Sequence, residues 1–341
     1  MKIVFISGPY KPSKCGISDY IDLLSDELRK NYHVCDHVSI SKKDSLINIS
    51  RHMPLADLYS IQFAPYAFSD VGLSKKGLFK LAKSLREKKT HINFHEIWIG
   101  AYPMASLKEK TLGWIQKREI IKFLSLLKPS LITCSNSAAM DRMQSALIKI
   151  KYLYLFGNIP YSQNHTENQS NKLSVVFFGT HYKSFPYKIL ADKLRKISTI
   201  LKKSIHIKII GRSREAIGLN KIISISKFNN FRLSQLGELS ECKVSKELQK
   251  SDIGVSTTPY DIIGKSGATA AMLEHGLPVL AYDDGDTPKE KLFVFDEFKD
   301  QLFLLNEHSM INRLNAFIQK SRKPFFDGVA YTTKKMIELV N

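Results

Sequence analysis

The sequence Gly-Lys-Ser-Gly at residues 264–267 combines the residue types that best hold a phosphate group. It follows a short apolar run at 253–255, and the alanine-rich stretch after it favours a helix that Gly276 ends. A glycine-rich loop at a helix N-terminus offers backbone N–H groups and the positive end of the helix dipole to an anion. Lys265 adds a positive charge. The segment therefore predicts a diphosphate site, with a plain helix cap and a solvated lysine as the alternative.

Two better-known phosphate motifs are excluded. A Walker P-loop needs a glycine five positions before the glycine of Gly-Lys-Ser, where this chain has Pro259. The dinucleotide motif Gly-x-Gly-x-x-Gly does not occur. The diphosphate interpretation therefore depends on the elements around the segment.

The sequence offers little for a metal ion or a disulfide framework. Cys15, Cys35, Cys134 and Cys242 lie far apart and form no Cys-x-x-Cys pair, which is typical of free cytosolic thiols. The acidic run Asp-Asp-Gly-Asp at 283–286 is typical of a turn, with a metal ligand as the alternative. We therefore expect no cofactor and a metal-independent reaction.

Apolar runs separated by helical patterns predict two similar halves. The predicted strands are 3–7, 34–40, 58–63, 92–94, 131–134 and 152–155 in the first half, and 173–178, 205–210, 222–225, 252–256, 278–282 and 301–305 in the second. Strands alternating with helices are typical of parallel sheets that carry helices on both faces. We therefore predict an α/β fold of two doubly wound, Rossmann-like domains that face a cleft.

A polar stretch at 161–172 has almost no apolar residues and separates the two halves. The predicted organisation is an N-terminal domain at 1–160, a linker at 161–172 and a C-terminal domain at 173–320. We expect a helix at 321–341 to pack back on the N-terminal domain. Ligands bind beyond the C-terminal ends of the strands in such sheets, so the loops after the strands are the candidate binding regions.

The net charge of +19 over 341 residues implies an anionic partner. Nucleic acid, an anionic membrane surface and phosphorylated substrates are the candidates, but no nucleic-acid-binding motif is present, so we expect no nucleic acid partner. Residues 73–89 form a basic amphipathic pattern in which Leu78, Ala82 and Leu85 share one face. Such a helix can lie on an anionic membrane surface, and an ordinary solvated surface helix is the alternative.

Two features bear on the location of the protein. No run approaches the roughly 18 apolar residues that a membrane-spanning helix needs. The apolar run at 3–7 is too short for a signal peptide and predicts a buried strand instead. We therefore expect a cytoplasmic protein that associates peripherally with the inner face of the cell membrane through residues 73–89.

Two motifs resemble the GT-B glycosyltransferases, most closely the family-4 type known as glycosyl transferases group 1. They are Gly-Ile-Ser-Asp-Tyr at 16–20 and the block at 252–282, which ends in Gly-Leu-Pro-Val-Leu-Ala-Tyr. His95 in Asn-Phe-His-Glu and Ser135 in Thr-Cys-Ser match less of the pattern, and the resemblance covers most of the chain. It implies an enzyme that moves a sugar from a nucleotide sugar, bound mainly by the C-terminal domain, to an acceptor bound by the N-terminal domain.

The resemblance assigns roles to single residues. Gly16 resembles the loop glycine that approaches the donor, and His95 resembles the histidine that reaches the donor sugar. Gly179 and Gly211 resemble the strand-ending glycines that flank the nucleotide. Asp19 is a candidate general base, with a stabilising effect on the helix dipole as the alternative.

The chain departs from the family at the two glutamates that usually precede Gly-x-Pro-Val. Ile263 and Ala271 stand at these positions, and Glu274 is the candidate substitute for the glutamate that binds ribose. Thr180 stands where the family has an arginine, so Lys183 and Arg212 become the candidate cations.

The expected chemistry follows from the leaving group. A nucleoside diphosphate gains negative charge as it departs, and cations and helix N–H groups stabilise that charge. The expected catalytic residues are His95 and Asp19, and no metal ligands are expected. The expected donor-binding residues are Gly16, Gly179, Lys183, Gly211, Arg212, Tyr260, Lys265, Ser266, Gly267 and Glu274, with Tyr260 beside the nucleotide base.

The sequence therefore predicts a retaining hexosyltransferase. Its substrates would be a nucleotide sugar and a glycan or glycolipid acceptor, in the synthesis of a surface polysaccharide or lipopolysaccharide. One alternative is a nucleotide-sugar epimerase or hydrolase of the same fold. The other is a non-catalytic basic protein that binds a membrane or nucleic acid.

Overall fold

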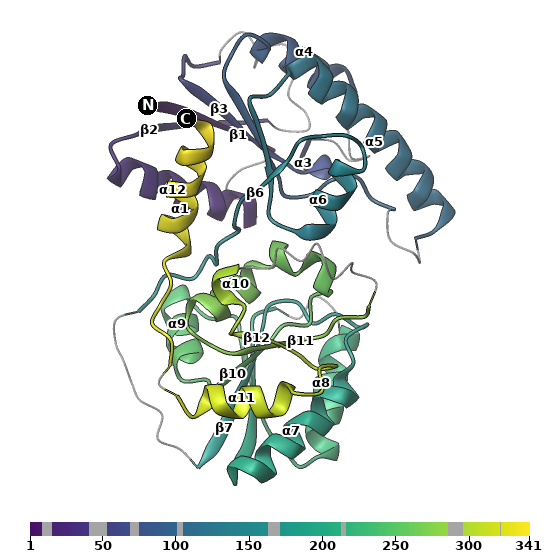
Figure 1. Ribbon diagram of the computed structural model, residues 1–341, viewed down its shortest axis with the longest axis vertical. Helices are drawn as coiled ribbons and strands as arrows, with labels where there is room; N and C mark the ends of the chain where they lie inside the picture. Colours follow the sequence, from purple (N-terminus) through teal and green to yellow (C-terminus); the bar gives the residue numbers. More distant parts are fainter. Residues whose placement is uncertain are drawn as a thin grey trace. The chain divides into compact units, whose positions relative to one another are not determined.

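The computed structural model describes residues 1–8, 16–40, 53–68, 75–100, 105–162, 171–212, 216–285, 296–320 and 322–341. The chain forms two compact units. Unit 1 contains Met1–Ser135, Ala139–Leu153 and Val329–Asn341, and unit 2 contains Asn136–Ala138 and Tyr154–Gly328. Each unit is built on one parallel sheet flanked by helices, so the α/β class with two Rossmann-like halves is confirmed (Figure 1).

The sheet of unit 1 has the strand order β2-β1-β3-β4-β5-β6. The strands are β1 (Lys2–Ser7), β2 (Val34–Ser39), β3 (Leu58–Phe63), β4 (Thr90–Phe94), β5 (Leu131–Cys134) and β6 (Lys151–Tyr152). The helices of this half are α1 (Gly16–Lys30), α3 (Pro65–Phe68), α4 (Lys75–Leu85), α5 (Leu107–Leu127) and α6 (Ser137–Gln144), and α12 (Gly328–Val340) joins them from the end of the sequence. The order reverses between β1 and β3, which is the doubly wound arrangement.

The two faces of this sheet differ in polarity. Every residue of β3 and of β4 is buried. Ile61 and Phe63 belong to an apolar cluster with residues of α4 and α5. Because successive side chains of a strand point to opposite faces, Ser60 and Gln62 lie on the other face. This second face is buried but polar, and it becomes part of a candidate site below.

The sheet of unit 2 has the strand order β12-β11-β10-β7-β8-β9. The strands are β7 (Lys172–Phe178), β8 (Ser204–Ile210), β9 (Arg232–Gly237), β10 (Ile253–Val255), β11 (Val279–Ala281) and β12 (Leu302–Leu304). The helices are α7 (Tyr187–Leu201), α8 (Ala216–Phe228), α9 (Glu241–Gln249), α10 (Gly267–Glu274) and α11 (Met310–Ile318), with 3-10 helices η1 (Tyr260–Lys265) and η3 (Asp296–Phe298). The order reverses between β7 and β10, so ligands are expected at the C-terminal ends of these two strands.

One predicted strand is wrong. Residues 222–225 lie inside helix α8, and the strand that follows β8 is β9 at Arg232–Gly237. The β-branched isoleucines suggested a strand, but Gly218, Ile222 and Ser226 recur every four residues and form the buried face of a helix.

The division between the units also differs from the predicted linker. The chain passes from unit 1 to unit 2 after Leu153, not within 161–172, and residues 163–170 of that linker lie outside the described residues. The physical reason is close packing: a Cβ atom on Gly157 would lie 2.6 Å from Ala271 Cα, so this part of the chain lies directly against α10.

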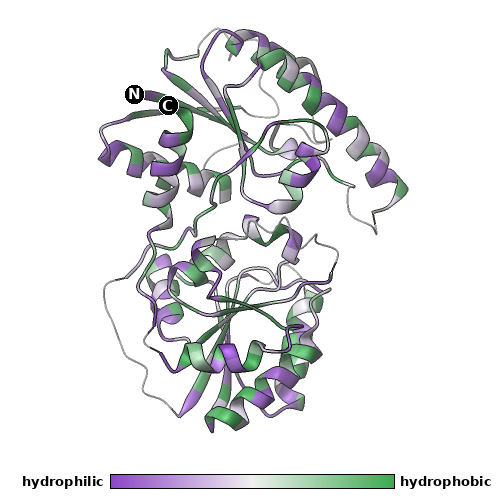
Figure 2. Ribbon diagram, viewed as in Figure 1, coloured by the Kyte–Doolittle hydropathy of each residue, from purple (hydrophilic) through white to green (hydrophobic). Residues whose placement is uncertain are grey.

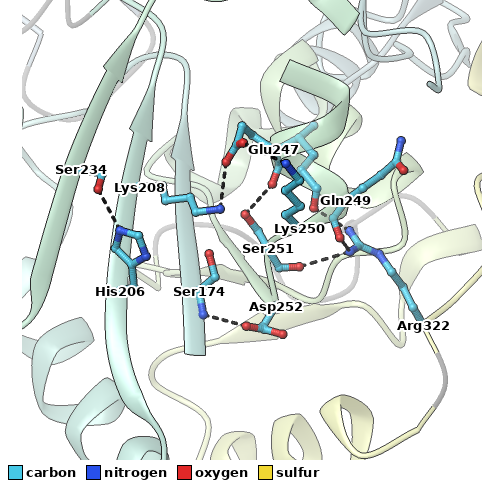
Figure 3. Close-up of polar contacts among 11 residues, drawn as sticks. Ser174, His206, Lys208, Ser234, Glu247, Gln249, Lys250, Ser251, Asp252 and Arg322 are labelled. Atoms are coloured by element: carbon cyan, nitrogen blue, oxygen red, sulfur yellow. Dashed lines mark hydrogen bonds and ion pairs between the residues drawn. The ribbon is translucent and has the colours of Figure 1, made fainter. Parts of the chain in front are cut away.

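Figure 3 shows the guanidinium of Arg322 beside Gln249 and Ser251 at the end of α9. The same guanidinium also bonds the end of α10. It donates hydrogen bonds to the carbonyls of Leu248 at 2.8 Å, Ser251 at 3.2 Å and His275 at 2.8 Å, and also to that of Gln249. These carbonyls lie at or just after the C-terminal ends of α9 and α10, where the helix dipole favours a cation. Arg322 therefore holds α10 and α9 together at the ends remote from the predicted phosphate site.

Among the helices of the described ranges, none is long and apolar enough to cross a membrane.

Candidate functional site

A cavity of about 240 Å³ opens in unit 2 where β7, β10 and α10 meet. Three segments line it: the loop after β7, the loop after β10 and the start of α10. Its lining residues are Phe178, Gly179, Thr180, Tyr182, Ser256, Thr257, Thr258, Lys265, Ser266, Gly267, Ala268 and Thr269. The cavity therefore lies at the strand-order reversal of the sheet, and four predicted donor-binding residues lie in its wall: Gly179, Lys265, Ser266 and Gly267.

Gly179 allows the loop after β7 to lie close to helix α10 in the wall of the cavity. Its φ is +86°, a conformation that favours glycine, and a Cβ atom there would lie 2.9 Å from Ala268 Cβ. Gly211 ends β8 with φ +100°, and Gly179 N donates to Ile210 O at 3.2 Å. The two predicted strand-ending glycines are thus neighbours, although only Gly179 lines the cavity.

The first turn of α10 is arranged to leave amides for a ligand. Ser266 is the N-cap, and its Oγ accepts hydrogen bonds from Thr269 N at 3.2 Å and Thr269 Oγ1 at 2.8 Å. Ala270 N donates to Ser266 O at 3.0 Å. The amides of Gly267 and Ala268 have no acceptor within the helix, since the first N–H groups of any α-helix lack one. An anion in the cavity would meet these two amides and the positive end of the helix dipole.

A threonine that the sequence analysis did not single out connects the other two walls. Thr257 Oγ1 donates to Thr180 O at 2.9 Å and accepts from Tyr182 N at 3.0 Å. It therefore ties the loop after β7 to the loop after β10. The sequence signal that could have identified Thr257 is its position just after a strand that borders the reversal of strand order.

Other predicted donor-binding residues lie away from the cavity wall. Arg212 is half exposed and pairs with Glu238. Lys183 is exposed in the loop after β7, and its carbonyl accepts from Lys221 Nζ at 2.8 Å. Tyr260 is buried at the start of η1, where burial, with smaller effects of acidic neighbours, raises the pKa of its hydroxyl to about 12.

Glu274 does not reach the cavity, so the predicted ribose contact is not supported. It ends α10, seven residues after Gly267, so a rise of about 10 Å along the helix separates it from the amides. Its side chain is 2% exposed, and Oε1 accepts from Tyr154 Oη at 2.9 Å and Gly157 N at 3.0 Å. Burial raises the pKa of Glu274 to about 8, although these two hydrogen bonds favour the charged form.

In unit 1, His95 follows β4 and is half-buried. Its Nε2 lies 2.8 Å from Gln62 Oε1, and its ring meets the Tyr20 ring edge-on with centroids 5.1 Å apart. Burial lowers the pKa of His95 to about 4, so the ring is neutral at pH 7. Because an amide oxygen only accepts, Nε2 carries the proton and Nδ1 presents a lone pair.

Gln62 belongs to a closed ring of buried hydrogen bonds. The ring members come from three neighbouring strands, and the register of β3, β4 and β5 brings them together on the polar face. Gln62 Nε2 donates to Ser60 Oγ at 2.9 Å, and Ser60 Oγ lies 3.0 Å from His91 Nδ1. His91 Nε2 lies 2.8 Å from Thr133 Oγ1, which donates to Asn93 Oδ1 at 2.9 Å.

Asn93 Nδ2 closes this ring by donating to Gln62 Oε1 at 3.2 Å. Burial, with a smaller effect of neighbouring His95, lowers the pKa of His91 to about 3, so His91 is neutral too. All five members then donate in one direction around the ring, which leaves Gln62 Oε1 as the acceptor for His95. The ring therefore holds the orientation of Gln62 and, through it, the proton position on His95.

The start of α1 carries two of the predicted site residues, Gly16 and Asp19. The helix begins at Gly16, so Ser18 lies inside its first turn, buried, and does not cap it. Asp19 is exposed in that first turn, where its charge favours the helix dipole. A Cβ atom on Gly16 would meet no atom of the described residues within 4 Å. The loop at 9–15 lies outside the described residues.

Within the described ranges, no group of three or more His, Cys, Asp or Glu side chains could hold a metal ion. Cys35, Cys134 and Cys242 form no disulfide bond among the described residues. Asp283 Oδ1 accepts from Gly285 N at 2.9 Å, which is the predicted turn.

No family model matches the chain, and no curated protein matches it. Solved structures match over nearly its whole length. Anabaena Alr3699/HepE in complex with UDP and glucose is 13% identical, with a TM-score of 0.57 over 100% of this chain and 96% of HepE. The lipopolysaccharide outer core galactosyltransferase WaaB, in its apo form, is 14% identical, with a TM-score of 0.55 over 98% and 95% of the two chains.

A putative UDP-N-acetylglucosamine 2-epimerase from Listeria monocytogenes is 11% identical, with a TM-score of 0.52 over 98% of this chain and 94% of the epimerase. At these identities the likeness shows the fold. The chain has the GT-B fold, two Rossmann-like units in sequence, which the residues at 16–20 and 252–282 predicted.

Proposed function

We propose that the protein is a glycosyltransferase that moves a sugar from a nucleoside-diphosphate sugar to a glycan or glycolipid acceptor. The observation that carries this proposal is the cavity at the N-terminus of α10. Its wall combines Lys265, the first-turn amides of α10, which have no acceptor within the helix, and a glycine that admits a ligand close to the backbone. These groups are suited to the negative charge that grows on a departing diphosphate.

The nucleotide is proposed to be uridine diphosphate. Support comes from solved structures of the same fold, since HepE is in complex with UDP and glucose and an α-glucosyltransferase is in complex with UDP. Donor binding would use Gly179, Lys265, Ser266 and Gly267, and Arg212 and Lys183 would need to turn from their present positions to take part.

His95 is proposed to act on the sugar or the acceptor through Nδ1, the nitrogen that no described residue bonds. With its pKa near 4 it would serve as a neutral hydrogen-bond acceptor at pH 7. Retention of the anomeric configuration, independence from metal ions and a role in surface polysaccharide or lipopolysaccharide synthesis remain parts of the proposal, the last supported by the galactosyltransferase WaaB.

The binding test is a thermal-shift titration with UDP, GDP, ADP, CMP and dTDP, each without and with magnesium. A nucleotide at about 100 times its dissociation constant should raise the stability by roughly 2.7 kcal/mol. Lys265→Ala should weaken binding at least about tenfold, because it removes a charge-assisted contact to phosphate. The matched control is Lys196→Ala, an exposed lysine on α7, which should bind normally. Equal binding by both variants would refute the site.

The second candidate, an epimerase or hydrolase, is favoured by the likeness to the putative epimerase. The two reactions differ in their need for an acceptor. Incubation of the purified protein with the donor alone should leave the nucleotide sugar intact if it is a transferase. Release of UDP or conversion of the sugar without acceptor would favour the second candidate.

A further inference from the structure

The basic stretch at 73–89 cannot itself enter a membrane surface. Its apolar side belongs to the core of unit 1: Leu78, Leu81, Ala82 and Leu85 of α4 are at most 1% exposed. Inserting them into lipid would require the core to open. The expectation that this stretch provides the apolar contact is therefore wrong. The exposed side chains of its described part are those of Lys80, Lys83, Arg86, Glu87, Lys88 and Lys89.

The neighbouring helix α5 supplies the exposed apolar side chains that α4 lacks. α5 packs beside α4 (Figure 1). Lys122 Nζ of α5 lies 4.7 Å above the ring of Phe79 of α4. Along its outward side stand Leu107, Trp114 and Ile121, which are 83%, 58% and 38% exposed. A spacing of seven residues is close to two helical turns, so the three side chains form one line about 20 Å long. Hydrophobic and hydrophilic residues alternate along this helix pair in Figure 2.

Exposed cations flank this line, and the exposed acid of the 73–89 stretch, Glu87, lies beyond the end of α4. The exposed cations are Lys80 and Lys83 on α4 and Lys108, Lys110, Arg118 and Lys122 on α5. α4 has no acidic residue, and the two on α5, Glu109 and Glu119, are half-buried. Glu109 is further engaged in a capping box, where its carboxylate accepts from Ser106 N at 2.8 Å. Arg118 lies 4.7 Å above the ring of Trp114.

We propose that the outward faces of α4 and α5 dock on an anionic lipid surface. Trp114, with Leu107 and Ile121, enters the interface, while the lysines remain at the level of the headgroups. An exposed tryptophan between exposed aliphatic residues favours a lipid interface, where an aromatic ring sits between hydrocarbon and water. The surrounding lysines favour anionic headgroups and hold their apolar stems along the surface. Nucleic acid would use the cations and leave the aliphatic residues exposed to water.

The test uses sedimentation of the full chain with phosphatidylcholine vesicles, with and without phosphatidylglycerol. We expect binding only to the anionic vesicles and weaker binding as salt rises. Trp114→Ala, and separately the pair Lys108→Glu with Lys110→Glu, should each reduce binding at least about fivefold. Matched controls are Phe228→Ala, an 87% exposed ring on α8, and the pair Lys188→Glu with Lys196→Glu on α7.

A spectroscopic measurement tests the same contact directly. The chain has two tryptophans, and Trp98 is 7% exposed. In a Trp98→Phe variant, the fluorescence of Trp114 should therefore shift to shorter wavelength on addition of anionic vesicles. The proposal is overturned if that emission stays unchanged, or if the α5 variants bind vesicles as well as the controls do.

Two other occupants are outcomes of the same experiment. Binding of an arbitrary DNA duplex, without vesicle binding, would assign the surface to nucleic acid and overturn the proposal. A change from dimer to monomer on Trp114→Ala in analytical ultracentrifugation, with vesicle binding unchanged, would assign it to a second copy of the chain and also overturn it.

Discussion

Tyr154 Oη donates a 2.9 Å hydrogen bond to Oε1 of Glu274, the residue that ends the helix above the candidate phosphate site. Gly157 N donates to the same oxygen at 3.0 Å, and Phe326 N donates to the carbonyl of Glu274 at 2.9 Å. A Cβ atom on Gly328 would collide with this oxygen. The chain enters unit 2 at Tyr154 and leaves it after Gly328. Glu274 therefore contacts both the segment that enters this unit and the segment that leaves it.

The first prediction concerns the protonation of Glu274. The folded state keeps this proton up to about pH 8, whereas the unfolded chain releases it near pH 4.5. In that interval the folded state binds more protons, so Glu274 makes the free energy of unfolding fall as pH rises, by at most about 1.4 kcal/mol per pH unit. Glu274→Gln, which is always neutral, should be the more stable protein near pH 8 and close to the wild type near pH 5. Denaturant unfolding across this range measures the difference.

Glu241→Gln is the matched control for this experiment, because Glu241 is exposed in the first turn of α9. It should change the stability by no more than about 0.5 kcal/mol at any pH. Parallel curves for wild type and Glu274→Gln would show that the buried carboxyl does not hold its proton.

The second prediction tests the close approach at Gly179. Gly179→Ala places a methyl group against Ala268 at a φ of +86°, and we expect a loss of stability of about 2 kcal/mol and at least about tenfold weaker UDP binding. Gly237→Ala is the control, since Gly237 has φ +66° but open space around it. It should suffer the backbone strain of about 1 kcal/mol without loss of UDP affinity. Calorimetric titration separates the two, and equal affinity losses would contradict the site geometry.

The third prediction concerns the proton position on His95. Heteronuclear NMR of the wild type at neutral pH should show Nε2 protonated and Nδ1 bare. Gln62→Glu places a carboxylate 2.8 Å from Nε2 and should raise the His95 pKa from about 4 by about 1–3 units. The acid limb of the profile of activity against pH should move to higher pH together with the His95 pKa.

Thr133→Val provides the comparison for the NMR and activity measurements. It opens the hydrogen-bond ring between His91 and Asn93 without adding a charge near His95. A drop in stability of about 1–3 kcal/mol is expected, because it leaves buried polar groups unpaired. An Nδ1-protonated His95 in the wild type would mean that the ring runs in the opposite direction.

The fourth prediction is structural. Arg322→Ala removes the donor of four carbonyl hydrogen bonds at the ends of α9 and α10, and we expect unit 2 to lose about 2 kcal/mol. Arg322→Lys should recover only part of this, because an ammonium group cannot match the planar fork of a guanidinium. The neighbouring Lys323, whose ion pair with Asp300 is 3.6 Å long and partly exposed, is the control. Lys323→Ala should change the stability by less than about 1 kcal/mol.

The block at 252–282 was readable from sequence because its signals are local. An apolar strand, a glycine-rich turn, an alanine-rich helix and a second apolar strand follow one another without interruption, and each has its own propensity. The positions of Gly179 and Gly211 were readable for the same reason, as glycines directly after buried strands. Helix α8 and strand β9 were not, because isoleucine is β-branched yet tolerated in helices, and β9 is an edge strand with alternating polar residues.

The hydrogen-bond ring and the burial of Glu274 depend on contacts between residues that lie far apart in the sequence. Ser60, His91 and Thr133 stand on three different strands, and only the register of these strands makes them neighbours. Glu274 has the sequence environment of a surface helix residue. Its burial follows from the segment at Tyr154 and Gly157, more than a hundred residues earlier, which no local pattern reveals.

The return of residues 329–341 to unit 1 sets an order for assembly during synthesis. Met336 and Thr332 of α12 are fully buried in a unit whose sheet was completed by β6, almost two hundred residues earlier. Domains usually fold as units, the N-terminal one first, as the chain emerges from the ribosome. Here the N-terminal unit must wait, with the α12 binding surface open, until all of unit 2 has been made. The second unit can thus reach its final packing before the first.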